Sequence, residues 1–413
     1  MIKDEQSVDR TARFRTSGAA LLSAGVLSDY LDYSRQLVLD EIRAIVPRDR
    51  RDTGGLYQLM LDYPLRYGKS LRPALSIAVC RATGGLLSAV LPTAAVLELY
   101  HNAFLIHDDI EDQSYLRRAE TTLSRQHGVP TAINVGDGML ALTMQPLLEN
   151  IGRIGLGKTL KVLRTVARMA RESAEGQMLE LRWISSVAWD HVDADYVRLV
   201  HKKTGWYSFI APVMVGAIIA GLADHEVERI ARKFVPLGVA FQLQDDILNL
   251  VSNEAEYGKD LWGDLWEGKH TLILIHALRV ARPVERTEAL RILRKAHPAA
   301  PPHSPRDSKA EGLALMDMTV KEGALTEGAN AKLARVWGDQ VSTSSEEVKS
   351  EADIGYLREL VRRTDSVAYA QLVARRYALR FRREIGGVLA ALPPSDHRDF
   401  LADLADFTTN REQ

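Results

Sequence analysis

The feature that most constrains the fold is the spacing of apolar residues, which recur every three or four positions along almost the whole chain. This spacing is clearest in residues 30–46, 89–106, 160–181 and 230–250. Alternation of apolar and polar residues over a strand length is rare, and Asn-Gly or Asp-Gly hairpin turns are almost absent. Because this spacing places apolar side chains on one face of a helix, the pattern predicts an all-α protein whose helices pack as a bundle.

Composition and charge exclude several classes of protein. A hydrophobic content of 46% with 26% charged residues is typical of a soluble globular protein rather than a disordered one. The net charge of −1 gives no general attraction to nucleic acid or anionic membranes. A single cysteine, Cys80, rules out a disulfide within the chain. The N-terminus has no apolar signal core, and the apolar run 209–222 is too short for a membrane span. We therefore expect a cytoplasmic protein without stable membrane insertion.

Two stretches interrupt the helical pattern. Residues 297–305 hold four of the 15 prolines, and residues 342–351 are polar. A helical pattern lies between them at 313–337, and a long one at 368–392 ends at Pro393-Pro394. We therefore expect a single domain over 1–413 with an insertion at about 296–353.

An apolar helical run beginning at Asn102 ends in three aspartates, Asp108, Asp109 and Asp112. On a helix, residues three and four apart are neighbours, so the three carboxylates can share one face. Clustered hard oxygen ligands suit Mg²⁺, which is commonly held by a few carboxylates together with substrate phosphates. Taken alone, the motif is equally compatible with an acidic patch on a solvated helix.

A second aspartate pair follows the same design. Asp245 and Asp246 end an apolar helical run, with Asn249 one turn beyond and Gln242 nearly one turn before Asp245. Helical bundles commonly build metal sites from inward side chains on facing helices. The two aspartate-rich helices are therefore expected to face each other across a cavity.

The set of motifs, in this order, resembles that of the trans-isoprenyl diphosphate synthases, the polyprenyl synthetase family. The motifs are Gly68-Lys-Ser-Leu-Arg-Pro73, Asp108–Asp112, Arg117-Arg118, Gly176-Gln177, Lys203-Thr204, Asp245–Asn249 and Glu267–Thr271. The resemblance implies an isoprenoid-synthase-type helical bundle around a central cavity, and a homodimer. It also implies a Mg²⁺-dependent condensation of isopentenyl diphosphate with an allylic diphosphate, with three ions per active site. The departing diphosphate then serves as base, and no protein base is assigned.

The resemblance also implies a role for each residue that matches a family motif. The metal ligands are expected to be Asp108, Asp109, Asp112, Asp245, Asp246 and Asn249. The allylic diphosphate is expected on Arg117, Lys203, Gln242 and Lys259, and Thr204 and Lys269 are expected to bind substrate as well. Isopentenyl diphosphate is expected on Lys69, Arg72, His101 and Arg118. The residues expected to contribute most to catalysis are Asp108, Asp109, Lys203, Asp245 and Lys259.

Product length is expected to depend on residues just before the first motif. Phe104 lies one turn from Asp108, about 6 Å along the axis, where its ring would shorten the hydrocarbon tunnel, while the small Ala103 leaves space. Asn249-Leu250 resembles the second motif of eukaryotic-type geranylgeranyl diphosphate synthases. These features favour a C20 product, geranylgeranyl diphosphate, with the C15 farnesyl diphosphate as the alternative. The family pattern is broken at Ser70, where a basic residue is usual, and at Ala119-Glu120, which replaces a glycine followed by a basic residue. The second change is expected to reduce positive charge near the isopentenyl site.

Three other functions compete with this one. A class I terpene cyclase shares the bundle but needs no isopentenyl pocket, for which Lys69, Arg72, His101 and Arg118 are present. A non-catalytic subunit of a heteromeric synthase tends to lose its metal carboxylates, whereas this chain keeps both aspartate pairs. A helical scaffold protein leaves the ordered set of charged motifs without explanation.

Overall fold

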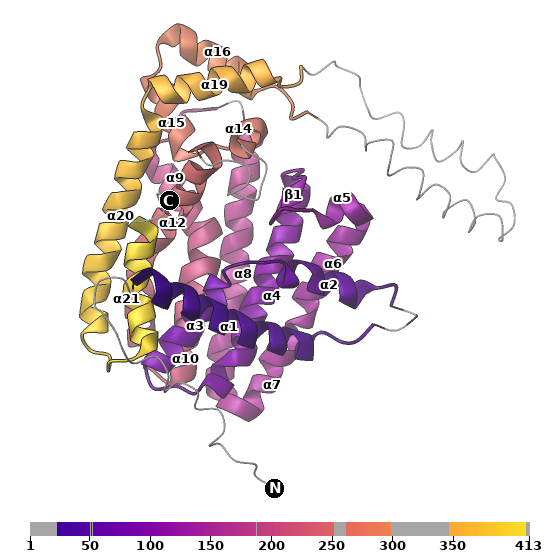
Figure 1. The fold of residues 1–413 in the computed structure, drawn as a ribbon, viewed down its shortest axis with the longest axis vertical. Coiled ribbons are helices and arrows are strands. Elements are labelled where there is room, and N and C mark those ends of the chain that lie inside the picture. The colour runs from indigo at the N-terminus through magenta and orange to yellow at the C-terminus, as the bar shows by residue number, and fades with distance from the viewer. Residues whose placement is uncertain are drawn as a thin grey trace, which may run out of the picture.

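The computed structural model describes residues 23–49, 51, 53–186, 188–251, 262–298 and 347–409. Within these ranges the chain forms a bundle of helices with one β-hairpin (Figure 1). The hairpin consists of two short antiparallel strands, β1 (Leu116–Arg117) and β2 (Glu120–Thr121). The all-α fold predicted from the apolar spacing is confirmed.

The helices of the first half run from α1 to α8. Their bounds are α1 Ser23–Ile45, α2 Leu56–Leu65, α3 Leu71–Ala82, α4 Leu87–Glu111, α5 Leu123–His127, α6 Val129–Leu142, α7 Met144–Ile154 and α8 Leu156–Ser185. The second half contains α9 Asp193–Val200, η3 His201–Ile210, α10 Ala211–Ala220, α11 Asp224–Lys233, α12 Val235–Val251, α14 Gly263–Glu267, α15 Leu272–Val280, α16 Pro283–Leu293, α19 Glu351–Arg363, α20 Ser366–Leu389 and α21 Asp396–Thr409.

Helix α4 forms the centre of the bundle. It is buried on nearly every side from Val90 to Ala103, because its sequence is apolar all round rather than along one stripe. It packs against α1, α3, α6 and α7, while α12 packs against η3 and α20. Since α4 and α12 each end in an aspartate pair, the core helices themselves fix the position of both pairs.

Helices α9, η3 and α10 follow one another without a break from Asp193 to Ala220. The middle segment, His201–Ile210, is a π-helix, in which hydrogen bonds close wider turns than in an α-helix. Such segments are rare and are frequent at functional sites. Here the π segment contains Lys203 and Thr204, two of the predicted substrate ligands.

Two helical stretches, Leu87–Glu111 and Asp193–Ala220, are long and apolar enough to cross a bilayer by length and composition. In both, 78% of the most apolar window is buried inside the bundle, as is usual for core helices.

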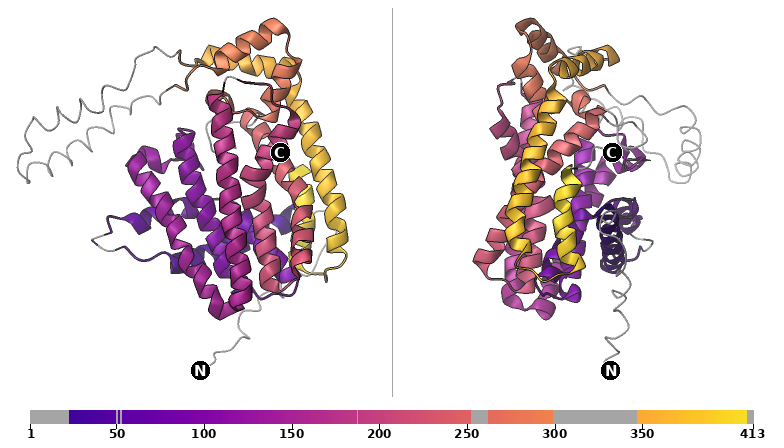
Figure 2. Two further views of the ribbon diagram at one scale, coloured as in Figure 1. Left: turned by 180° about the vertical axis from the view of Figure 1, so that it is seen from behind. Right: turned by 60° about the vertical axis from the view of Figure 1, so that its left-hand side comes forward.

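The ends of the predicted insertion lie side by side. The backbone N–H of Ala296 donates to Glu347 O at 3.0 Å, and that of Lys349 donates to Ala296 O at 3.0 Å. The predicted helix at 313–337 lies outside the described residues. Helix α16, which precedes the insertion, and α19, which begins at its end, pack together at one end of the bundle, and α20 runs back along it (Figures 1 and 2). The bounds of α20 match the predicted C-terminal helix to within three residues.

Candidate active site

A cavity of about 290 Å³ opens where the aspartate ends of α4 and α12 meet. Asp108 lines it from α4, and Asp245 and Asp246 line it from α12. Residues from α3, β1, α8, α9, η3 and α14, and from the segment between α14 and α15, complete the wall. The expected arrangement of two aspartate-rich helices around one cavity is therefore present.

Within the first pair, Asp109 is fully enclosed and only 1% exposed. Tyr63 Oη donates to its Oδ2 at 2.6 Å, and Arg117 Nε donates to its Oδ1 at 2.8 Å. Because these protein donors occupy both oxygens, the environment of Asp109 differs from that expected of a metal ligand. The Arg117 guanidinium is likewise committed to Asp109, although it reaches the cavity wall.

Asp108 and Asp112 lie one turn apart, each next to a lysine. Lys203 Nζ is 3.3 Å from Asp108 Oδ1 and also pairs with Glu180. Lys269 Nζ is 2.7 Å from Asp112 Oδ2. Burial raises the pKa of Asp112 to about 6, against the lowering effect of Lys269. Burial lowers the pKa of Lys203, but Asp108 and Glu180 outweigh it and hold that pKa above its usual range.

In the second pair, too, the second aspartate is enclosed by protein donors. Asp246 is 5% exposed and accepts a hydrogen bond from Tyr196 Oη at 2.6 Å and another from Gln242 Nε2 at 2.8 Å. The Thr204 hydroxyl in turn donates to Gln242 Oε1 at 2.6 Å. Burial, reinforced by the nearby Asp264, raises the pKa of Asp246 to about 8.

Asn249 has a different environment from the one expected. It is buried, and its Oδ1 accepts a hydrogen bond from the Asp264 backbone N–H at 3.2 Å, in the first turn of α14. Asn249 therefore fixes the start of α14, which brings the Asp264 carboxylate to the cavity wall. Lys259, another predicted ligand, lies outside the described residues.

A second group of cations lines the other side of the cavity. Arg72 donates to Ser208 Oγ at 2.8 Å and lies 4.4 Å above the Tyr207 ring, against which His101 also stacks. Arg118 donates to Tyr63 O at 2.7 Å, and burial lowers its pKa.

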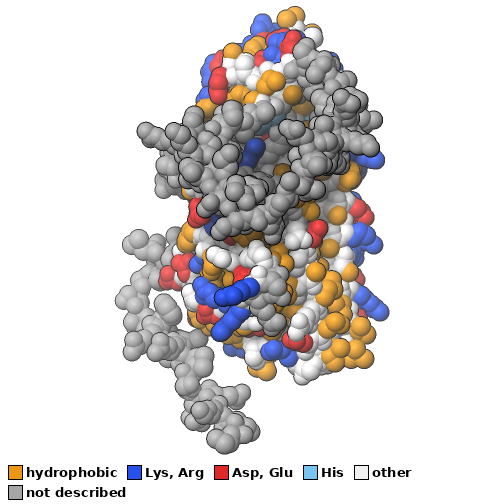
Figure 3. Space-filling view, turned by 90° about the vertical axis from the view of Figure 1, so that its right-hand side faces the viewer, with side chains coloured by type: hydrophobic (Ala, Val, Ile, Leu, Met, Phe, Trp, Pro, Cys, Tyr) orange, Lys and Arg blue, Asp and Glu red, His pale blue; other side chains and the backbone are white. Residues whose placement is uncertain are grey.

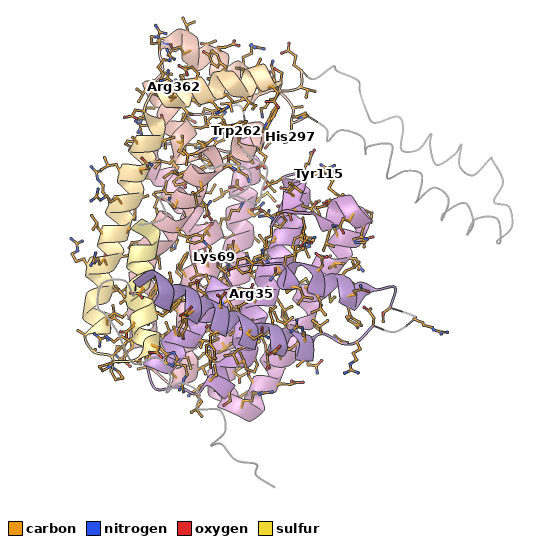
Figure 4. All side chains as sticks on the ribbon, viewed as in Figure 1. Arg35, Lys69, Tyr115, Trp262, His297 and Arg362 are labelled. Carbon is orange, nitrogen blue, oxygen red and sulfur yellow. The ribbon has the colours of Figure 1, made fainter. Side chains whose placement is uncertain are left out.

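The Gly68–Pro73 segment, which leads into α3, lies against the Arg118 side chain of this group. A Cβ at Gly68 would lie 2.6 Å from the Arg118 guanidinium carbon, so glycine leaves room for the Arg118 head group in this position, and a larger residue would displace it. Ser70 donates to the buried Glu98 at 3.3 Å. Lys69, labelled in Figure 4, is exposed in the loop and is not part of the cavity wall.

The close approach of Gly176 to the backbone of Lys203 positions Lys203 in the site. A Cβ on Gly176 would lie 2.4 Å from Lys203 N and 2.6 Å from Lys203 Cα. Glycine therefore lets α8 touch the backbone of the π segment directly, which places Lys203 between Asp108 and Glu180.

The apolar part of the wall includes Leu105, Tyr207 and Phe241. Phe104 contacts Tyr207 edge-on, with ring centroids 5.7 Å apart, and Ala103 is completely buried. Phe104 thus lies next to a wall residue, and its effect on product length stays a prediction.

The wall residues that sequence reasoning missed include four with polar side chains: Glu180, Tyr196, Asp264 and His270. Two carried a usable signal. Glu180 lies one turn after Gly176 on α8, and Asp264 lies three residues before the Glu267–Thr271 segment. Tyr196 and His270 carried none, because an aromatic residue in an apolar helix or beside a lysine is usually structural.

The acidic side chains suit a hard divalent cation that also binds phosphate. Among the described residues, no three His, Cys, Asp or Glu side chains converge into a self-sufficient metal site. Mg²⁺ does not require one, since it is usually held by one or two carboxylates plus substrate phosphates and water. Asp108 on one side and Asp245 with Asp264 on the other meet that requirement on the cavity wall. Asp112 lies one turn from Asp108, outside the wall itself, and is paired with the wall residue Lys269.

Comparison with known proteins gives a consistent result. The polyprenyl synthetase family model matches residues 55–302, more than half of the chain. The geranylgeranyl diphosphate synthase of Sulfolobus acidocaldarius is 31% identical over 59% of this chain and 72% of that protein. The octaprenyl diphosphate synthase of Escherichia coli is 32% identical over 52% of this chain and 64% of that protein.

A solved structure shares the fold over nearly the whole length. The polyprenyl synthase of Caulobacter crescentus, complexed with calcium and isoprenyl diphosphate, superimposes with a TM-score of 0.70 at 25% identity. The match covers 97% of this chain and 100% of that one. With its two aspartate pairs on one cavity and its match to the family model, the chain belongs to the polyprenyl synthetase family.

Proposed function

We propose that the enzyme condenses isopentenyl diphosphate with an allylic diphosphate in a Mg²⁺-dependent reaction whose main product is geranylgeranyl diphosphate. Transfer of prenyl groups follows from membership of the family. The main support for a Mg²⁺-dependent condensation of two diphosphates is the cavity, in which carboxylates of α4 and α12 lie near two separate groups of cations.

The metal ligands we propose are Asp108 and Asp112 on one side and Asp245, assisted by Asp264, on the other. Asp109 and Asp246 have both oxygens engaged by protein donors and instead hold their helices in place. When bound, three Mg²⁺ ions would neutralise the charge that builds on the departing diphosphate.

Lys203 and Lys269 would hold the allylic diphosphate. Both ammonium groups are mostly buried and paired with aspartates, so a lysine and its aspartate can bind phosphate and metal side by side. Gln242 and Thr204 form a hydrogen-bonded pair beside them. We propose that Arg117 acts through Asp109 rather than on the substrate.

Isopentenyl diphosphate would occupy the second group of cations, Arg72, His101 and Arg118, with Lys69 reaching in from the loop. Guanidinium groups bind phosphate oxygens in bidentate fashion, and a partly desolvated arginine does so more strongly than one in water. Arg72 is held between Ser208 and Tyr207, which leaves it oriented for this purpose.

The reaction then proceeds between these two groups. The C–O bond to the allylic diphosphate breaks, and the double bond of isopentenyl diphosphate forms the new C–C bond. The departing diphosphate takes up the proton that is lost. Tyr207 and Phe241 present aromatic rings to the cavity, where they can stabilise a developing allylic cation. The apolar wall also excludes water from that cation.

We also propose a cytoplasmic homodimer, with α6, α7 and the start of α8 as its interface. Hydrophobic side chains at least 42% exposed gather on these helices, and Figure 3 shows such side chains concentrated on that side of the molecule. They are Val129, Ile133, Met144, Leu148, Ile151, Leu156 and Leu160. A face of this kind marks an interaction site. Light scattering should give twice the 46.0 kDa of one chain, and a monomeric mass would contradict the proposal.

Product analysis tests the proposed reaction. Purified enzyme receives labelled isopentenyl diphosphate, Mg²⁺ and either dimethylallyl, geranyl or farnesyl diphosphate, and the products are separated by chain length. We expect label in a C20 diphosphate with every primer that is accepted. A C15 end product would correct the chain length, and a hydrocarbon formed without isopentenyl diphosphate would identify a terpene cyclase.

A further inference from the structure

The two aspartate pairs share a construction that the aspartate motifs do not specify. Tyr63 Oη is 2.6 Å from Asp109 Oδ2, and Tyr196 Oη is 2.6 Å from Asp246 Oδ2. In both pairs the second aspartate is therefore bound by a tyrosine, through the same oxygen and at the same distance.

The remaining oxygen of each second aspartate accepts from a side-chain N–H donor in both pairs. Asp109 Oδ1 accepts a hydrogen bond from Arg117 Nε, and Asp246 Oδ1 accepts one from Gln242 Nε2, both at 2.8 Å. One tyrosine hydroxyl and one nitrogen-bearing side chain thus satisfy each carboxylate, although Arg117 donates through two N–H groups and is charged, whereas Gln242 donates through one and is neutral. Two carboxylates 137 positions apart in the sequence are therefore held by similar sets of hydrogen-bond donors.

Each tyrosine joins two helices. Tyr63 belongs to α2 and Tyr196 to α9, whereas the aspartates belong to α4 and α12. Both tyrosines are at most 3% exposed, and burial raises the pKa of each hydroxyl, so it stays protonated and donates. The hydrogen bond therefore ties the aspartate end of a core helix to its neighbour.

The consequence concerns the first aspartate of each pair. Adjacent residues on a helix point about 100° apart, so fixing Asp109 also fixes the direction of Asp108, and fixing Asp246 fixes that of Asp245. Asp108 and Asp245 both line the cavity. We propose that Tyr63 and Tyr196 are positioning residues, each of which aims one aspartate pair at the metal–diphosphate site. The inference rests on the metal ligands proposed above.

The test removes one hydroxyl at a time. In Tyr63→Phe and Tyr196→Phe the ring stays and only the hydrogen bond is lost. We expect the Mg²⁺ concentration for half-maximal prenyl transfer to rise about tenfold in each variant, since a less ordered carboxylate pair binds the cation more weakly. Excess Mg²⁺ should restore most of the activity, which a purely structural defect does not allow.

Tyr30→Phe is the matched control. Tyr30 is also buried, and its hydroxyl is hydrogen-bonded to His397 Nδ1 at 2.8 Å, away from the cavity. This variant loses a comparable hydrogen bond and should keep the Mg²⁺ dependence of the wild type, whatever its melting temperature.

Direct binding separates this inference from the proposed function. Mn²⁺ is titrated into each protein with inorganic pyrophosphate present, and bound Mn²⁺ is measured by electron paramagnetic resonance. We expect weaker binding in both tyrosine variants than in the wild type and Tyr30→Phe. If the wild type transfers no prenyl group, the proposed function fails, whereas the binding data still test the tyrosines. Half-saturation within twofold of the wild type in both variants, or loss of folded protein in both, would overturn the positioning role.

Discussion

Replacing Gly176 by alanine tests the contact that places Lys203 in the site. The new Cβ would lie 2.4 Å from Lys203 N, 2.6 Å from Lys203 Cα and 2.9 Å from Lys202 C. All three are backbone atoms, so no flexible side chain can move aside. Ordinary contact begins at 3.4 Å, and α8 must therefore move away from the π segment by about 1 Å.

The size of the effect follows from this displacement. Lys203 Nζ is 3.3 Å from Asp108 Oδ1, and an ion pair is broken beyond about 4 Å. A misplacement of about 1 Å in an active site commonly costs about 100-fold in rate. Overpacking costs about 1–3 kcal/mol of stability, which a protein of this size can tolerate. We therefore expect a folded Gly176→Ala enzyme with kcat lowered about 100-fold.

The assay is incorporation of labelled isopentenyl diphosphate under saturating substrates, with thermal unfolding measured in parallel. Gly157→Ala is the control, because Gly157 lies on the same helix and a Cβ there meets no atom within 4 Å. It should keep full activity and gain roughly 0.4–1 kcal/mol of stability. A Gly176→Ala enzyme as active as Gly157→Ala would refute the reasoning about Lys203.

Three further predictions concern other parts of the protein. Phe104→Ala should lengthen the main product, because it removes a ring that contacts the wall residue Tyr207; an unchanged chain length in product chromatography would show that other residues set it. Chelation by EDTA should abolish prenyl transfer and added Mg²⁺ should restore it, because the acidic wall holds diphosphate only through a cation; turnover that persists in EDTA would contradict the metal assignment. Burial lowers the pKa of His397 to about 4, whereas that of an unfolded histidine is about 6.5. The unfolded chain therefore binds more protons, and stability falls as the pH drops from about 6.5 to 4. His397→Gln should make the fall in melting temperature over this range shallower, and an unchanged slope would exclude His397 as a contributor.

The bundle and the two aspartate helices could be predicted because both depend on local spacing. Apolar residues every three or four positions define helices, and aspartates at the ends of two such runs define where each pair lies. The cations of the Gly68–Pro73, Arg117-Arg118 and Lys203-Thr204 motifs were found through the family pattern.

The partners of the second aspartates could not be predicted in this way. Tyr63 is 46 residues from Asp109, and Tyr196 is 50 residues from Asp246. Local spacing does not show that helices so far apart in sequence bring a hydroxyl to each carboxylate. The sequence therefore shows six metal-type side chains without distinguishing those whose carboxylate oxygens are already bound by protein donors from the others.

The remaining differences also arise from contacts between distant segments. Asn249 matches a metal-ligand position, but its side chain binds the backbone of Asp264, 15 residues later. The π segment at His201–Ile210 reads as an ordinary helix in the sequence, because its apolar spacing differs little from that of its neighbours. Its position depends on Gly176, which allows the close approach of α8.

The most direct test of the central claim is whether Mg²⁺ allows the wild-type enzyme to join labelled isopentenyl diphosphate to farnesyl diphosphate. The predicted result is a labelled C20 diphosphate, formed only when both substrates and Mg²⁺ are present. Absence of label from every longer diphosphate, with a folded protein and each allylic primer tried, would contradict the account.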